Sequence, residues 1–155
     1  MSDPLLDIRD LSVHFQTPEG IGRAVSSVDL SISPGETLGL VGESGCGKSV
    51  TALAVVGLVP SPPGRVVGGR VLFEGQDLLQ APPETLRRIR GRKIGMIFQE
   101  PMTALNPVLT IGRQMVEPLV THLGVSKKTA REKAVRWLDR VRIPSAREHM
   151  KNYPH

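Results

Sequence analysis

The sequence is poor in cysteine, aromatic residues and long apolar runs, and each shortage excludes a class of protein. A single cysteine, Cys46, rules out an internal disulfide framework and a cysteine-rich metal cluster in these 155 residues. Aromatic residues make up 3% of the chain, which disfavours a base-stacking surface for single-stranded nucleic acid. No apolar run approaches the roughly 18–20 residues that cross a bilayer, and no basic start followed by an apolar run marks a signal peptide. We therefore expect a chain that is soluble or that reaches a membrane through a partner.

What is present is typical of one globular domain. A length of 155 residues, with 39% hydrophobic and 23% charged residues, fits a single domain with a sizeable core. The net charge of +5 would permit a polyanion or an anionic membrane as partner. Excess lysine and arginine more often lie on solvated helix faces, however, so we expect no nucleic-acid partner.

Short apolar runs alternate with turn signals over the first hundred residues, which favours a mixed β/α part. The pattern predicts strands at 5–15 and 24–32 joined by a loop through Pro18, Gly20 and Gly22. It then predicts a strand buried on both faces at 37–41, a helix at 48–56, a strand at 70–73, a tight turn at 74–77, a short helix at 85–90 and a second buried strand at 93–98.

From Thr110 onward the apolar residues recur with helical spacing. Ile111, Met115, Leu119 and Leu123 predict one helix. Ser126 or Thr129 can cap a second helix, whose predicted apolar stripe is Ala130, Ala134, Leu138 and Val141 and whose Trp137 is predicted to pack in the core. Lys133, Arg136 and Arg140 lie off that stripe. The chain is thus expected to divide into a β/α core over about 1–100 and a helical part over about 108–155.

The run Gly42–Ser49 matches the phosphate-loop pattern G-x-x-x-x-G-K-[ST] in full, between a predicted buried strand and a predicted helix. Phosphate oxygens must be met by several backbone N–H groups at once, and the three glycines allow the tight wrapping that this requires. The helix N-terminus adds partial positive charge. The expected phosphate-binding set is Gly42, Glu43, Ser44, Gly45, Cys46, Gly47, Lys48, Ser49 and Val50.

Two of these residues have expected roles beyond shape. Lys48 is placed to reach the β- and γ-phosphates, and the Ser49 hydroxyl to ligate Mg²⁺. Cys46 is interpreted as a small filler, with redox sensitivity as a minor alternative because it lies at the start of a predicted helix. The loop by itself indicates a nucleoside triphosphate and leaves the protein family open.

The run Phe98-Gln99-Glu100-Pro101-Met102-Thr103-Ala104-Leu105-Asn106-Pro107 follows the loop lysine by about fifty residues. It resembles the Q-loop of ABC transporter ATPase subunits, in the subgroup that serves dipeptide, oligopeptide and nickel importers. The segments 8–13, 35–45 and 153–155 resemble the same family, so the resemblance covers essentially the whole chain. It implies an α/β P-loop NTPase (ABC ATPase) core with an N-terminal antiparallel β part and part of an α-helical subdomain, incomplete here.

The resemblance also implies residue roles. Phe15 aligns with the A-loop aromatic that stacks on the adenine of ATP, although a phenylalanine at a strand end is as often a core residue. Gln99 aligns with the glutamine that helps position Mg²⁺ and the attacking water and reports the γ-phosphate to the membrane subunit. A glutamine at a strand end could instead cap backbone groups.

The partners implied by the resemblance are integral membrane permease subunits, which dock on the helical subdomain, and a second ATPase subunit in a homo- or heterodimer. An extracytoplasmic solute-binding protein is implied indirectly. The expected location is the cytoplasmic face of the cell membrane, as a peripheral subunit. Dipeptides, oligopeptides, nickel and glutathione all remain open as the transported solute.

The chain departs from the family pattern where hydrolysis is concerned. Tyr153-Pro154-His155 would precede a Ser-Gly-Gly signature, which is absent, as are a Walker B strand, a catalytic glutamate and a switch histidine. The expectation is the N-terminal part of a longer protein, one that binds ATP weakly by itself and hydrolyses it negligibly. A truncated, non-catalytic nucleotide-binding or regulatory chain is one alternative, and an ABC ATPase acting on nucleic acid is another.

Overall fold

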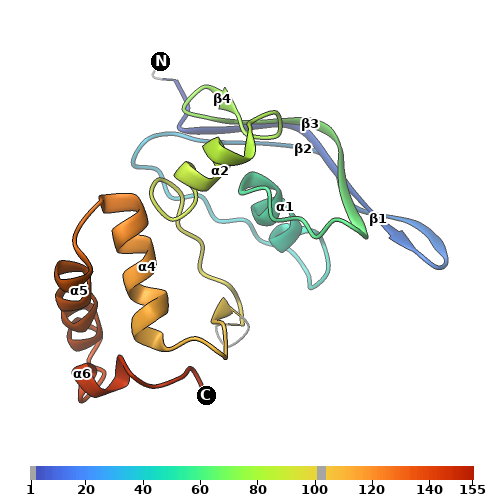
Figure 1. Cartoon of the computed structure of the whole chain (residues 1–155). Helices are drawn as coiled ribbons and strands as arrows, with labels where there is room; N and C mark the ends of the chain where they lie inside the picture. The colour runs from blue at the N-terminus through green and yellow to red at the C-terminus, as the bar shows by residue number, and fades with distance from the viewer. Residues whose placement is uncertain (1–2, 101–103) are drawn as a thin grey trace. The chain divides into compact units, whose positions relative to one another are not determined.

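The computed structural model describes residues 3–100 and 104–155. The chain divides between Arg87 and Arg88 into two compact units. The first unit contains a four-stranded antiparallel sheet in the order β2-β1-β3-β4 (Figure 1). The strands are β1 (Leu6–Thr17), β2 (Gly20–Ile32), β3 (Gly64–Phe73) and β4 (Gln76–Asp77). The helices are α1 (Lys48–Val55) in the first unit, α2 (Pro83–Ile89) at the boundary, and α4 (Ile111–Leu123), α5 (Lys127–Arg140) and α6 (Ala146–His149) in the second.

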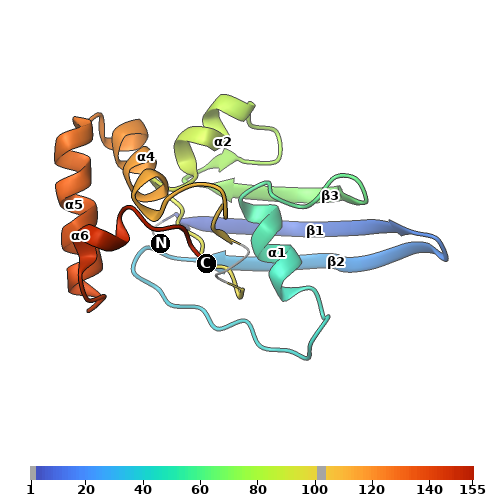
Figure 2. The same cartoon turned by 60° about the horizontal axis from the view of Figure 1, so that its bottom comes forward.

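The core of the first unit lies between the sheet and α1. Ile8, Leu11 and Val13 of β1 and Val71 of β3 are fully buried, and α1 contributes Thr51 and Ala54 from its buried face. Helix α1 lies across β1 and β2 in Figure 2. Because α1 contacts β1 and β2, the apolar side chains of the sheet lie against the buried face of the helix.

The antiparallel hairpin is longer than the sequence predicts. The predicted loop through Pro18, Gly20 and Gly22 is wrong, because β1 continues to Thr17 and β2 begins at Gly20, which leaves only a tight turn between them. The Thr17 hydroxyl donates to the Gly20 carbonyl at 2.9 Å and closes this turn. Gly20 and Gly22 are typical turn residues, but they lie in β2 because the pairing with β1 continues up to Gly20.

The strand predicted at 37–41 does not form. No described strand pairs with this run, and its apolar side chains are exposed, Leu40 to 50% and Val41 to 93%. A strand that is buried on both faces needs a neighbour on each edge and a layer on each face, and the described residues supply neither here. The second predicted buried strand, 93–98, is also wrong. Within it only Ile94 forms an isolated bridge, to Arg90, while Ile97 is 98% exposed.

The second unit is built on the predicted helices. The Thr110 side chain caps α4 by accepting from the Arg113 N–H, and the Ser126 hydroxyl caps α5 by accepting from the Thr129 N–H. Ala134 and Leu138 of α5 pack with Ala146 and Met150 in one buried cluster.

Two predictions about α5 are wrong. Trp137 is 52% exposed with the Arg140 guanidinium over its ring, and Val141 lies just past the helix and is exposed. An indole on the solvated face covers its surface through such a cation–π contact and needs no core position. Ala130, Ala134 and Leu138 of the predicted stripe are buried as expected.

Candidate phosphate-binding site

The loop Gly42–Ser49 joins the exposed run 37–41 to helix α1, which begins at Lys48 as predicted. Gly45 and Gly47 have positive φ values of 83° and 93°, in the left-handed region that only glycine adopts without strain. Gly47 is the N-cap residue of α1 and so turns the chain from the loop into the helix. The loop therefore bends sharply twice within three residues.

Gly47 is required by its surroundings as well as by its φ value. A Cβ atom at this position would clash with the backbone oxygen of Ala24 in β2. That approach is far inside van der Waals contact, and the atom it meets is backbone, which cannot turn aside. The inner edge of the loop thus packs directly on the hairpin.

The Lys48 side chain folds back over the loop. Its ammonium group donates to the carbonyl oxygens of Gly42 at 2.7 Å and Glu43 at 2.6 Å, and lies 3.3 Å from the Cys46 sulfur. A lysine ammonium has three donors, and sulfur is the weakest of these three acceptors. The bond to Cys46 is therefore the one whose loss costs least when a phosphate oxygen accepts from Lys48 instead.

The N-terminus of α1 is open for an anion. Gly47 has no side chain to cap the helix, and the first turn contains no acidic residue. The first N–H groups of a helix have no intrahelical partner and carry the positive end of its dipole. Thr51 bonds the Gly47 carbonyl through both its N–H and its hydroxyl, at 2.8 and 3.0 Å, and so fixes the first turn.

The residues present fit a Mg²⁺–nucleotide in part. The Ser49 hydroxyl lies in the first turn of α1, is exposed, and has no partner among the described residues, so it is available as an oxygen ligand. No group of three or more histidine, cysteine or acidic side chains that could hold a metal ion occurs in residues 3–100 and 104–155. A magnesium ion at Ser49 would thus depend on oxygens from phosphate and water, as it commonly does.

The other two predicted site residues lie elsewhere. Phe15 is half-buried near the end of β1, beside Gly64 of β3, where a glycine Cβ would come within 2.8 Å of its ring. Gln99 is an exposed residue of the second unit, in the irregular segment after Ile94. Gly42 through Val50 form one continuous loop and the start of α1. Gln99 belongs to the second unit. Pro101, Met102 and Thr103 of the Q-loop run lie outside the described residues.

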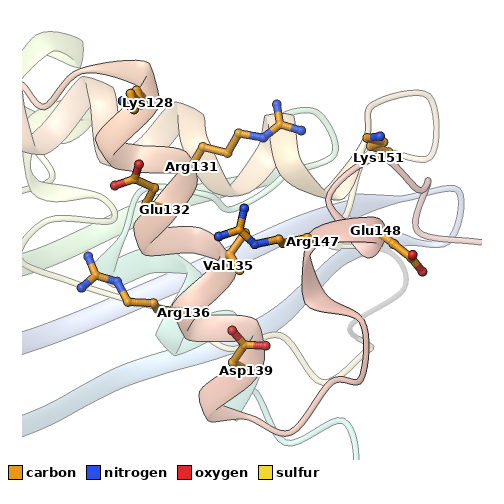
Figure 3. A pocket seen from close by; sticks show the side chains of 9 residues that line it. All are labelled: Lys128, Arg131, Glu132, Val135, Arg136, Asp139, Arg147, Glu148 and Lys151. Carbon is orange, nitrogen blue, oxygen red and sulfur yellow. The ribbon is translucent and has the colours of Figure 1, made fainter.

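A second surface, not anticipated from the sequence, lies on α5 and α6 (Figure 3). It is a hollow of about 710 Å³ whose charged side chains are five basic and three acidic residues. They are Lys128, Arg131, Arg136, Arg147 and Lys151, with Glu132, Asp139 and Glu148. No ion pair joins any of these side chains in the described part of the chain. Charges spaced three or four apart along α5 were the available signal, but such spacing also marks an ordinary solvated face.

Comparison with known proteins identifies the class. The family described as "ABC transporter" matches residues 25–155, so the chain belongs to the ABC transporter family. It is 48% identical over 154 residues to the oligopeptide transport ATP-binding protein OppD of Escherichia coli, covering 99% of this chain and 45% of that protein. It is also 48% identical to the probable peptide ABC transporter ATP-binding protein y4tR of Sinorhizobium fredii, covering 99% and 46%. The chain therefore spans about half the length of these curated relatives.

Solved structures agree on the fold. The chain superimposes on the ATP-binding cassette MJ0796, in a dimeric post-hydrolysis state bound to ADP and Pi, with a TM-score of 0.80 and 24% identity over 96% of this chain and 61% of that one. This confirms the predicted fold class, an incomplete α/β ABC ATPase fold with an antiparallel sheet and helices. None of the described helices is both long and apolar enough to cross a membrane.

Proposed function

We propose that this chain binds Mg²⁺–ATP at the loop Gly42–Val50 as part of the ATP-binding subunit of a peptide importer. Backbone N–H groups of the loop and the first turn of α1 cradle the phosphates, and the third donor of Lys48 moves from the Cys46 sulfur to a phosphate oxygen. Ser49 supplies the protein oxygen on Mg²⁺, Phe15 stacks on the adenine, and Gln99 helps position Mg²⁺ and the attacking water.

One observation carries the proposal: the loop already has the shape that phosphate binding needs. Two left-handed glycines, an uncapped helix start and a lysine bonded across the loop occur together in eight consecutive residues. A glycine-rich turn without a phosphate-binding role is not expected to combine these three features. The relatives named as peptide transport ATP-binding proteins support the same function.

The proposed partners follow from the family. Permease subunits in the membrane would dock on the helical second unit, a second ATPase subunit would complete the nucleotide site, and a solute-binding protein outside the cytoplasm would act through the permease. The chain would thus sit on the cytoplasmic face of the membrane as a peripheral subunit. The mixed-charge hollow of α5 and α6 is an exposed face of the unit proposed to dock.

The 155 residues alone are proposed to bind ATP weakly and to hydrolyse it negligibly. Most of the rate in phosphoryl transfer comes from positioning the water and from stabilising charge in the transition state. The sequence contains no apolar strand ending in Asp-Glu and no Ser-Gly-Gly signature to supply these groups. Binding and hydrolysis are therefore expected to separate in this chain.

The test is a titration of the chain with ATP and Mg²⁺, followed by calorimetry, against Lys48→Ala. Removing the ammonium deletes a charge-assisted bond to phosphate and is expected to weaken affinity by about tenfold or more. Arg70→Ala is the matched control, because it removes one positive charge from an exposed position of β3 in the same unit. Equal affinities of Lys48→Ala and the unaltered chain would contradict the site, and ATPase activity above that of Lys48→Ala would contradict the proposed inactivity.

A further inference from the structure

The basic residues of the chain are concentrated in its second unit. Residues 88–155 contain fourteen lysines and arginines against five acidic residues, whereas residues 1–87 contain six against ten. The formal net charges are therefore +9 and −4. Such a charge difference between two parts of one chain indicates a polyanionic partner, which is either a nucleic acid or a membrane surface.

Four of these cations converge on a hollow of about 390 Å³, the basic hollow. They are Arg113 of α4, Lys127 and Arg131 of α5, and Lys151 just after α6. The other residues that line it are uncharged, so it contains no carboxylate. The basic hollow shares Arg131 and Lys151 with the mixed-charge hollow, and in Figure 3 the Arg131 side chain extends from α5 toward the side where Lys151 lies.

Backbone hydrogen bonds and packing hold the elements of the basic hollow in place. The Ile111 N–H donates to the Asn152 carbonyl at 2.9 Å and so joins the start of α4 to the segment after α6. The Gly112 N–H donates to the Met150 carbonyl at 3.0 Å. Met150 in turn packs with Ala134 of α5 in the buried cluster. The backbone positions of the four cations are therefore fixed relative to one another within the second unit.

The charges of the basic hollow are not neutralised from within the protein. None of the four side chains forms an ion pair in the part of the chain that the structure describes. Lys127 and Arg131 lie four positions apart on α5, where like charges repel. Arg113 and Lys127 also lie in the first turns of α4 and α5, which contain no acidic residue and where the helix dipole is already positive. An anion from outside the chain would relieve this repulsion.

The available donors favour a surface that carries many phosphates over a small free anion. The first three N–H groups of α4 already donate to protein oxygens, at 2.9, 3.0 and 3.3 Å. Binding must therefore come mainly from the four side chains, all of which are exposed. Clusters of exposed lysine and arginine are typical of contacts with anionic phospholipid headgroups. The scarcity of aromatic residues disfavours single-stranded nucleic acid as the alternative.

We propose that the basic hollow binds the phosphate groups of anionic phospholipids at the cytoplasmic surface of the membrane. This inference rests on the proposed function, which places the subunit at that surface beside its permease. Arg113, Lys127, Arg131 and Lys151 contact headgroup phosphates through charge-assisted hydrogen bonds. The contact strengthens the association of the subunit with the membrane, independently of nucleotide and in proportion to the anionic lipid present.

The test is binding of the 155-residue chain to vesicles, measured by cosedimentation at several salt concentrations. Vesicles of equal parts phosphatidylcholine and phosphatidylglycerol are expected to bind the chain, and vesicles of phosphatidylcholine alone are not. Binding should weaken steadily with salt, because the screening length falls from about 10 Å at 0.1 M to about 3 Å at 1 M. No binding to either vesicle, equal binding to both, or binding that salt does not affect would each overturn the inference.

Two pairs of substitutions with the same change in net charge test where the contact lies. Arg131→Gln with Lys151→Gln removes the two cations that both hollows share. Each basic residue at an anionic membrane contributes about fivefold to binding, so this pair is expected to weaken vesicle binding by about thirtyfold. Arg88→Gln with Arg142→Gln removes two exposed charges of the same unit that line neither hollow, and is expected to weaken it by no more than about twofold.

Equal losses in the two pairs would mean that only net charge matters, and would overturn the inference. A conservative pair, Arg131→Lys with Lys151→Arg, keeps both charges and is expected to bind vesicles within about threefold of the unaltered chain. Circular dichroism of each variant checks the helices. Binding that the conservative pair fails to retain, with its helices intact, would also contradict a contact made by charge.

Two competitors distinguish lipid from other sources of phosphate. Inorganic pyrophosphate or a DNA duplex, each at the same phosphate concentration as the vesicle surface, is added to the bound chain. We expect most of the chain to stay on the vesicles. Displacement by pyrophosphate would identify a site for a small free anion, and displacement by the duplex would identify a nucleic-acid surface. Either result would overturn the lipid contact.

Vesicle binding and ATP binding can fail separately. Lys48→Ala is expected to lose ATP affinity and to keep its affinity for vesicles, because Lys48 belongs to the first unit. A chain that binds ATP but not phosphatidylglycerol vesicles would overturn the inference and leave the proposed nucleotide site intact. A chain that binds the vesicles through the basic hollow but does not bind ATP would contradict the proposed function and support the lipid contact.

Discussion

The phosphate loop Gly42–Ser49 and the apolar run 37–41 are adjacent in sequence but differ in what shapes them. The loop is fixed by contacts within seven residues, namely its own glycines and the bonds from Lys48 to Gly42 and Glu43, with β2 against its inner edge. The run has the composition of a buried strand, yet it forms none, because a strand is completed by partners distant in sequence. The conformation of the loop can be predicted from a short motif, whereas the formation of a strand depends on partners that are distant in sequence.

The largest change in stability is expected from replacing a leucine in a paired strand. Leu11 of β1 is fully buried between neighbours on both sides. Leu11→Ala is expected to lower the free energy of unfolding by about 2–5 kcal/mol, from lost burial and the cavity left behind. Chemical denaturation monitored by circular dichroism measures this. A loss below about 1 kcal/mol would show that the sheet of the first unit is loosely packed.

Gly47→Ala tests whether the loop is as rigid as its contacts suggest. The substitution places a Cβ against the Ala24 carbonyl and strains a left-handed residue, which costs about 1–3 kcal/mol for the backbone alone. We expect loss of ATP binding by calorimetry together with a lowered unfolding midpoint. Gly39→Ala is the matched control, since a Cβ there meets nothing within 4 Å. Unchanged ATP affinity in Gly47→Ala would mean that the loop accommodates the clash.

The smallest effect is expected in the exposed run. Leu40 is half-exposed and pairs with no strand among the described residues, so Leu40→Ala should change the free energy of unfolding of the 155-residue chain by no more than about 0.5 kcal/mol. The same denaturation experiment as for Leu11→Ala gives the direct contrast between two leucines. A loss of several kcal/mol would show that 37–41 is paired and buried in solution.

Particular residues show how far the sequence could predict this molecule. The start of α1 at Lys48, the Ser126 cap and the buried Ala130, Ala134 and Leu138 were predictable, because capping and helical spacing are local signals. The predicted strand at 93–98 and the predicted core position of Trp137 were wrong, since both depend on packing partners that periodicity does not specify.

The candidate site also combines features that local sequence predicts with features that it does not predict. The motif predicts a tightly wrapped phosphate loop, and two of its three glycines, Gly45 and Gly47, adopt left-handed conformations. In the second unit, the bonds from Arg92 to the His122 carbonyl and from Gln114 to the Asn106 carbonyl were not predicted, because no residue pattern marks a bond from a side chain to a backbone oxygen. The roles of Phe15 and Gln99 rest on family likeness and stay predictions.

The bonds from Lys48 to the carbonyls of Gly42 and Glu43 also have a consequence for entropy. They act as a non-covalent cross-link that closes a ring of six to seven residues, so part of the conformational freedom of the loop is already lost before an anion arrives. Lys48 then contributes twice to affinity, once as a charge and once by reducing the ordering that binding must impose. Replacing it with alanine should therefore make the entropy of nucleotide binding less favourable as well as the enthalpy.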